Sequence, residues 1–236
     1  MSMRRRAVVL LAAFPVFLAL LGLGAWQVQR LQWKQGLIAA VDARIASPPR
    51  PLDDVLASGE DVDYRPVTVS GTFAHSGERH FFSTFRGETG FQLFTPLDRG
   101  GHVYVFVNRG FVPYDRKDPA TRAEGQVAGP VTVTGFARAV LAGKPGRFLP
   151  DNDPSKNMFY WKDLDAMATS AGLPADATVL PLFIDAGPAP NAGGLPVGGT
   201  TIVEFPNSHL QYAVTWFGLA LALALVTGAF LWRARP

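Results

Sequence analysis

Two long segments without a charged residue lie near the ends of this chain, and they constrain its architecture more than any other feature. Ala7 to Ala25 and Ala213 to Leu231 each hold 19 consecutive uncharged residues. At about 1.5 Å of rise per residue, a helix of that length spans roughly 28 Å, which is close to the hydrocarbon thickness of a bilayer. We therefore predict a transmembrane helix at each end of the chain and a lipid bilayer as its first partner.

Basic residues at the two ends predict how the chain is oriented in the membrane. Three arginines precede the first segment at positions 4–6, and two follow the second segment at positions 233 and 235. Lys and Arg favour the cytoplasmic side, so both termini are predicted to be cytoplasmic. In a bacterial plasma (inner) membrane, this multi-pass arrangement places the central domain in the periplasm. The predicted boundaries are cytoplasmic tails at 1–6 and 233–236, transmembrane helices at 7–27 and 212–232, and a periplasmic β-rich domain at 28–211.

A cleaved signal peptide is the alternative for the first segment, because the arginines resemble the positively charged start of such a peptide. The apolar run is longer than that of a typical signal sequence, and Trp26 stands where cleavage needs a small residue. We therefore interpret the segment as a permanent membrane anchor.

The charge of the chain does not indicate binding to nucleic acid. The pI is about 9.4, but five of the 22 basic residues lie in the predicted tails, which leaves 17 basic against 19 acidic residues in the outer part. The high pI therefore reflects membrane topology. The absence of cysteine excludes disulfides and thiolate metal sites, although an oxidising compartment is compatible with it.

The central region changes from a helical to a β periodicity. Apolar side chains recur at three- and four-residue steps from Trp26 to about residue 46, which predicts a helical juxtamembrane extension over 28–46. After several prolines, residues 64–73 alternate in the manner of a strand. Further strands are expected at 79–86, 91–97, 102–109, 130–139 and 178–186, short helices at 51–58 and 159–171, and a mobile surface loop at 114–129.

Consecutive strands joined by turns favour antiparallel pairing. We therefore expect a membrane protein of the α+β class. Two transmembrane helices flank a mainly antiparallel, barrel- or sandwich-like β domain outside the cytoplasm, and this domain carries one or two short helices.

The sequence nominates no catalytic residue. The histidines, at positions 75, 80, 102 and 209, lack the spacing of a zinc site. The chain also lacks a G-x-S-x-G elbow, a P-loop and a G-x-G-x-x-G turn. We therefore do not expect an enzyme.

His209 is the candidate ligand-binding residue. His209, Tyr212 and Trp216 lie at i, i+3 and i+7, which places an imidazole, a phenol and an indole on one helix face at the membrane surface. A neutral imidazole is a good ligand for haem iron, and aromatic neighbours suit an amphipathic macrocycle. The same residues are typical of an interfacial aromatic belt that contacts water and lipid headgroups. The residue pattern leaves both interpretations open.

Four segments resemble the Surfeit locus protein 1 family of assembly factors for cytochrome c oxidase. They occur in the order found in that family and are spread over nearly the whole chain. The segments are LGAWQVQRLQWKQGLI at 23–38, YRPVTVSGTF at 64–73, VFVNRGFVP at 105–113 and FPNSHLQYAVTWFGLALAL at 205–223.

The resemblance implies a two-span protein that promotes maturation of the catalytic subunit of a haem–copper oxidase. It implies delivery or insertion of haem a, with contacts to oxidase subunit I and to haem a synthase. His209 matches the histidine that is implicated in haem binding in the family, so its imidazole would ligate the iron. The alternative from a different functional class is a haem-free membrane scaffold that stabilises subunit I during assembly.

A haem at His209 would need walls and counter-charges from both membrane helices. We expect the face of the second helix that carries His209 to point toward the first helix. Arg30 or Lys34 would meet the haem propionates. The aromatic residues expected to wall the ring are Trp26, Trp33, Tyr212 and Trp216.

Overall fold

The computed structural model describes residues 3–201 and 205–233. They form two compact units. One unit holds the long helices, residues 3–42 with 205–233, and the other holds the β domain, residues 43–201. All the candidate haem-binding residues belong to the helical unit.

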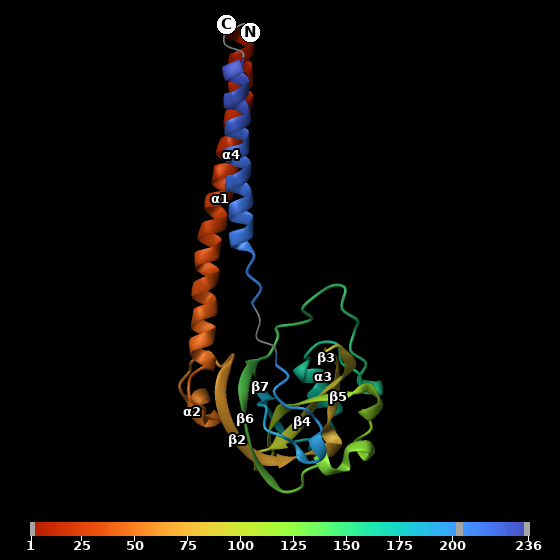
Figure 1. Ribbon diagram of the computed structural model, residues 1–236. Helices are drawn as coiled ribbons and strands as arrows, with labels where there is room; N and C mark the ends of the chain where they lie inside the picture. The colour runs from red at the N-terminus through yellow and green to blue at the C-terminus, as the bar shows by residue number, and fades with distance from the viewer. Residues whose placement is uncertain (1–2, 202–204, 234–236) are drawn as a thin grey trace. The chain divides into compact units, whose positions relative to one another are not determined.

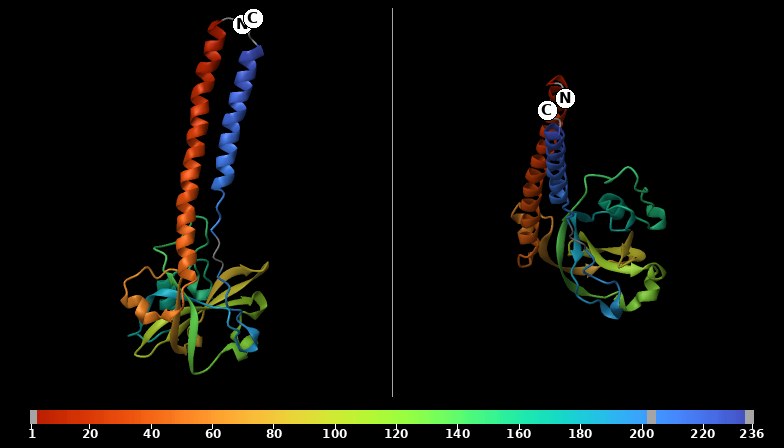
Figure 2. Two further views of the ribbon diagram at one scale, coloured as in Figure 1. Left: turned by 60° about the vertical axis from the view of Figure 1, so that its left-hand side comes forward. Right: turned by 45° about the horizontal axis from the view of Figure 1, so that its top comes forward.

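The helical unit consists of α1 (Met3–Ile45) and α4 (His209–Arg233), which run side by side in opposite directions (Figure 1, Figure 2). The predicted helical continuation beyond Trp26 is confirmed. The helix α1 ends at Ile45, just before prolines that cannot continue it. Both helices are long and apolar enough to cross a membrane, which supports a membrane protein. The bilayer limits at 7–27 and 212–232 stay predictions, and α4 already begins at His209.

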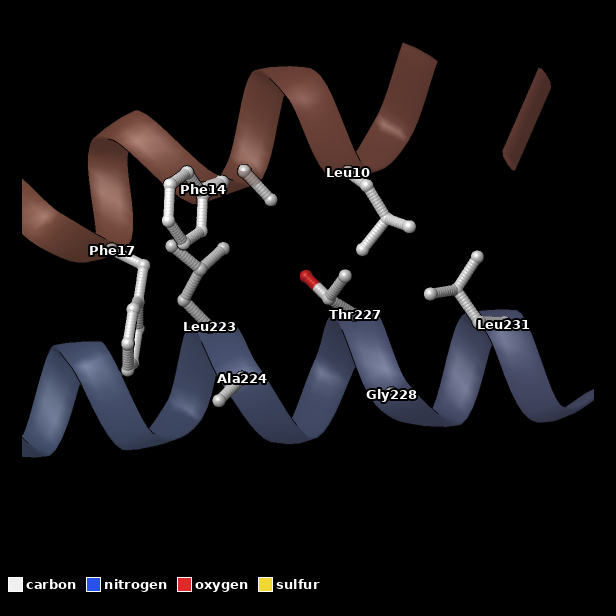
Figure 3. Close-up of a pocket in the computed structure, with 9 residues that line it drawn as sticks. Leu10, Phe14, Phe17, Leu223, Ala224, Thr227, Gly228 and Leu231 are labelled. Atoms are coloured by element: carbon white, nitrogen blue, oxygen red, sulfur yellow. The ribbon is translucent and has the colours of Figure 1, made fainter. Parts of the chain in front are cut away.

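An apolar hollow of about 270 Å³ lies between α1 and α4 in the half of the pair nearer the termini (Figure 3). Figure 3 shows Phe14 and Phe17 on α1 facing Leu223 on α4. Ala224 and Gly228 of α4 also line the hollow, and the methyl group of Ala224 and the missing side chain of Gly228 leave the space between the helices unfilled.

The β domain is built on one sheet that closes on itself. The strand order is β1-β2-β6-β7-β5-β4-β3, and an additional pairing joins the end of β2 to β4. Strands β2, β6, β7, β5 and β4 therefore form a ring, while β3 pairs with β4 outside it (Figure 1). The strands are β1 (Arg50–Pro51), β2 (Arg65–Phe73), β3 (Arg79–Phe85), β4 (Glu88–Asp98), β5 (Val103–Pro113), β6 (Pro130–Ala139) and β7 (Thr178–Ala186).

The pairing within this ring is mainly antiparallel, and the predicted barrel-like α+β domain is confirmed. The exception in the ring is the parallel pair β5–β7, and β1 pairs in parallel with β2 outside the ring. A five-stranded ring with this order and a single parallel pair has the connectivity of an OB-type barrel. The short helices are α2 (Leu52–Ala57), α3 (Leu164–Ser170) and the 3₁₀ turns η1 (His75–Gly77), η2 (Tyr114–Arg116), η3 (Pro119–Gly125), η4 (Pro154–Lys156) and η5 (Ala192–Gly194).

Alternation along β5 divides its side chains between two hydrophobic cores. Val105 and Val107 belong to a core that takes aliphatic residues from every strand of the ring, and this core fills the barrel. Phe106 belongs to a second core with Phe94 and Phe183, which α3 covers on the outer face of the sheet. Complete burial of each such side chain contributes about 1.5–3 kcal/mol.

The helix predicted over 159–171 is wrong in its first five residues. The N–H of Phe159 donates to the carbonyl of His80 at 2.9 Å, so this stretch pairs with β3 instead of coiling. The helix α3 begins only after Asp163, whose carboxylate accepts a hydrogen bond from the N–H of Ala166 at 3.0 Å and caps the helix. The apolar spacing therefore reflects burial in one core and not one continuous helix.

The mobile surface loop predicted over 114–129 is corrected in the structure, because this segment forms the turns η2 and η3 and is fixed by a buried arginine. Arg122 is 5% exposed, and its guanidinium donates to the carbonyls of Arg116 and Lys117, each at 3.1 Å. It also forms an ion pair with Glu78 at the start of β3. Because the segment is rich in charged residues, the burial of Arg122 was not predictable from its composition.

Candidate functional site

His209 is the first residue of α4, and its ring lies against α1. The Nδ1 atom of His209 is 2.7 Å from Oε1 of Gln27, a residue that is only 8% exposed. An amide oxygen accepts hydrogen bonds but cannot donate them, so with the Gln27 oxygen as the acceptor the imidazole donates from Nδ1. The predicted orientation of His209 toward the first helix is therefore confirmed.

The other ring nitrogen of His209 is free to bind a ligand. Among residues 3–201 and 205–233, Nε2 has no hydrogen-bond partner. A histidine whose Nδ1–H is held by a neighbouring oxygen and whose Nε2 keeps its lone pair has the arrangement typical of metal-bound histidines. The same described residues contain no cluster of three His, Cys, Asp or Glu that would hold a bare metal ion. The chemistry of this imidazole is compatible with binding a haem iron through Nε2.

Small residues bring the two helices close together beside His209. Ala213 and Ala220 of α4 are 2% and 1% exposed. A β-carbon added to Gly24 of α1 would lie 2.7–2.9 Å from ring atoms of Phe217. Small residues that allow backbones to approach are the usual basis of helix association in membranes. This contact sets the distance over which Gln27 reaches His209.

Replacing Gly24 by Ile is expected to weaken the α1–α4 contact by about 1–3 kcal/mol, because the added side chain overlaps the ring of Phe217. Spin labels on Val8→Cys and Phe230→Cys, two positions that line one hollow, would report a broader distance distribution. Gly22→Ile is the matched control, since nothing lies within 4 Å of a β-carbon there. Equal broadening in both variants would contradict the role of Gly24.

The structure does not gather Trp26, Arg30 and Trp33 around His209. These three residues form a stripe on α1 that is turned by about 100° from Gln27. Trp26 and Trp33 are each 54% exposed, and the guanidinium carbon of Arg30 lies 3.9 Å from the ring centre of Trp33. The predicted aromatic walls on α1 are therefore exposed beside the contact and do not enclose the imidazole.

The residues predicted on α4 divide in the same way. Trp216 is half-buried and shares the α1-facing side with His209, whereas Tyr212 is 52% exposed and turned by about 60°. Lys34 donates from Nζ to the carbonyl of Pro206, just before α4. Lys34 thus contacts the residues that precede α4, while His209 contacts α1 at Gln27, about two turns away from Lys34.

Gln27 is the residue of the candidate site that the sequence did not predict. It stands one position from Trp26, which drew attention as an interfacial aromatic residue, and its amide has no motif of its own. The available signal was the spacing of Gly24, Gln27, Leu31 and Lys34 at three- and four-residue steps, which marks the face of α1 that meets α4.

Comparison with known proteins identifies the family. The sequence model of the SURF1 family matches residues 14–221, a range that includes Gln27 and His209. The chain belongs to the SURF1 family. It is similar to the protein named Surfeit locus protein 1 from Xenopus tropicalis, with 39% identity over 232 residues that cover 90% of this chain and 72% of the relative. The Homo sapiens relative of that name is 37% identical over 230 residues, covering 89% and 72%. The Takifugu rubripes relative is 35% identical over 233 residues, covering 91% of each chain.

SURF1 membership supports a role in the assembly of cytochrome c oxidase. SURF1 proteins are assembly factors, and the two candidate transmembrane helices agree with a member that works in a membrane.

Proposed function

We propose that this SURF1 protein promotes delivery or insertion of haem a into the catalytic subunit of a haem–copper oxidase, and that His209 holds the haem transiently. The imidazole would supply an axial ligand to the iron through Nε2. Trp216 lies on the same face of α4 and would contact the porphyrin ring. Trp26, Trp33 and Tyr212 would reach the ring only by turning from their exposed positions.

The contact between His209 and Gln27 is the observation that carries this proposal. An interfacial belt residue can satisfy its ring nitrogens with water or a headgroup, so that role does not require a buried amide at 2.7 Å. A ligating imidazole gains from it, because the acceptor fixes the tautomer and the ring orientation. Gln27 would therefore act as a positioning residue for His209.

The partners in this role would be oxidase subunit I, which receives the haem, and haem a synthase, which supplies it. The location proposed is a bacterial inner membrane with both termini cytoplasmic and the β domain periplasmic. Arg4, Arg5 and Phe230 line one hollow, so the basic ends of α1 and α4 lie on the same side of the helix pair. A shared basic side supports this orientation. The relatives named above are eukaryotic, so the bacterial location rests on the sequence alone.

The test is the absorption spectrum of the full chain purified from membranes after co-production with haem a synthase. We expect a Soret band in the wild type, its loss in His209→Ala, and haem affinity about 10–100-fold weaker in Gln27→Leu, which removes the acceptor for Nδ1. His102→Ala is the matched control, because it removes an exposed imidazole that pairs with Asp176 in the β domain. Equal haem content in wild type and His209→Ala would refute haem binding at this site.

The haem-free scaffold is the alternative, and the exposure of Trp26, Trp33 and Tyr212 favours it. Exposed aromatic side chains beside a helix pair suit contacts with a partner's membrane helices. In that case His209→Ala would still co-purify with subunit I and restore oxidase activity. The haem content of His209→Ala and its ability to restore oxidase activity therefore distinguish the two functions.

A further inference from the structure

A cavity of about 190 Å³ in the β domain has one strongly charged group in its wall. Its sides come from the end of β2, from β6, and from the segment after β7, and they include Phe73, Val131 and Val133. Its lining residues include Arg109 and no Asp or Glu. Pockets for drug-sized ligands begin at about 300 Å³, so this cavity suits a smaller molecule.

Arg109 is buried without an acidic partner. The residue is 2% exposed, and no carboxylate in the described part of the chain forms an ion pair with it. Arg122, another buried arginine of the β domain, pairs with Glu78 instead. A buried guanidinium without a counter-ion is costly, and burial lowers the pKa of Arg109 to about 10. At neutral pH the group still carries its positive charge.

The neighbour of Arg109 supplies no negative charge either. His75 donates from Nε2 to the carbonyl of Val127 at 2.9 Å, which leaves Nδ1 as an acceptor 3.5 Å from a nitrogen of Arg109. Burial lowers the pKa of His75, so the ring is neutral at physiological pH. The carboxylate of Glu78 acts on Arg109 through space, but it is paired with Arg122, so Arg109 has no ion-pair partner of its own among the described residues.

The guanidinium keeps donors available for a ligand. It has five N–H groups, of which one donates to the carbonyl of Gly125 and another faces His75. The remaining three have no hydrogen-bond partner among residues 3–201 and 205–233. The ring of Phe73 lies 4.7 Å from the guanidinium carbon and holds the group by a cation–π contact.

We propose that this cavity is a binding site for a small organic carboxylate, with Arg109 as the anion-binding residue. A guanidinium binds a carboxylate through two parallel hydrogen bonds, and the apolar side chains in the lining favour an anion with an apolar body over inorganic phosphate. Phe73, Val131 and Val133 form the apolar wall that contacts the rest of the molecule. The site belongs to the β domain and does not depend on haem binding at His209.

Benzoate is the probe, used on the full chain in detergent at constant ionic strength and followed by calorimetry and thermal unfolding. We expect saturable benzoate binding that raises the melting temperature, with binding about tenfold or more weaker for the neutral isostere benzamide and for inorganic phosphate. Arg109→Met should abolish benzoate binding. Ala189→Trp should do the same while leaving the melting temperature without ligand unchanged, because this exposed residue lines the cavity and its replacement fills the space without touching the guanidinium.

Three results would overturn the binding site at Arg109, and a fourth would overturn its assignment to a carboxylate. These are no benzoate binding by the wild type, equal affinity for benzoate and benzamide, and unchanged benzoate affinity in Ala189→Trp. The last two comparisons need no variant at Arg109, so they decide the question even if Arg109→Met does not fold. Phosphate binding as tight as benzoate binding would refute the carboxylate assignment.

Discussion

Glu78→Gln is expected to destabilise the β domain by about 3–5 kcal/mol, because it leaves the guanidinium of Arg122 buried without its counter-charge. Glu78 is 4% exposed, accepts a hydrogen bond from Arg122 Nη1 at 3.1 Å, and lies 2.9 Å from Nε2 of His80. For a chain of this size, the loss corresponds to a fall in melting temperature of roughly 6–20 °C. Thermal unfolding of the full chain in detergent, followed by near-UV circular dichroism, measures it.

A double replacement distinguishes the net contribution of the ion pair to stability from the cost of leaving one charge buried without its partner. Glu78→Met with Arg122→Met should cost less than the sum of the two single changes, since no charge stays buried. The exposed pair of Asp53 and Arg99 provides the control, because Asp53 is 72% exposed in its side chain and Asp53→Asn should cost about 0–1 kcal/mol. If Glu78→Gln cost no more than this control, the buried pair would not hold η3 to β3.

The same pair makes the stability of the domain sensitive to acid. Burial alone would raise the pKa of Glu78, but hydrogen bonds from His80 and Arg122 and the charge of Arg122 bring it below its ordinary value of 4.5. A carboxyl group with a lower pKa in the folded chain stabilises the fold above its unfolded pKa, and this contribution is lost as the pH falls through the folded pKa. The stability difference between wild type and Glu78→Gln should therefore shrink below about pH 4.5.

Gly110→Ala is expected to cost about 3 kcal/mol or more. A β-carbon at this position would lie 1.9 Å from the carbonyl oxygen of Val197, and the backbone has φ +124°. That carbonyl accepts a hydrogen bond from the N–H of Phe111 at 2.8 Å, and the N–H of Val197 donates to the carbonyl of Phe111 at 2.8 Å. The variant combines a strained backbone with the loss of two hydrogen bonds. Thermal unfolding and hydrogen exchange at Phe111 and Val197 measure both effects.

Gly100→Ala isolates the conformational part of that cost. Gly100 has φ +95°, but nothing lies within 4 Å of a β-carbon there. Its replacement should cost about 1 kcal/mol and leave exchange at Phe111 unchanged. Equal destabilisation by the two replacements would mean that the contact with Val197 contributes nothing.

The periodic parts of the fold were predictable from the sequence because local pattern and tertiary contact agree there. The strand at 130–139 and the strand at 178–186 were predicted with the bounds that the structure has. The neighbours of these strands in the sheet were not predicted. The pairing of β7 with β5 depends on closure of the ring, and no short turn joins these two strands. The burial of Arg122 was not predictable either, because it depends on an ion pair with Glu78, which lies 44 residues away in the sequence.

The candidate site was predictable on α4 and not on α1. His209 was identified because an imidazole directly before a membrane-length apolar run is visible in the local sequence. Gln27 escaped because its role depends on how the two helices are rotated against each other, and Gly24 and Phe217 set that rotation across 193 residues of sequence. For the same reason, Trp26 and Trp33 were expected at the contact although the stripe that carries them lies beside it.

The parallel pair of β5 and β7 has a consequence for how this protein is made. Residues 114–177 must leave the ribosome before the open edge of β5 finds its neighbour, and an apolar strand with an unpaired edge can recruit other chains in that interval. Only residues 187–208 separate the end of β7 from the first turn of α4. The strand that closes the barrel is therefore made shortly before the second membrane helix, so closure of the domain and insertion of α4 fall close together in time.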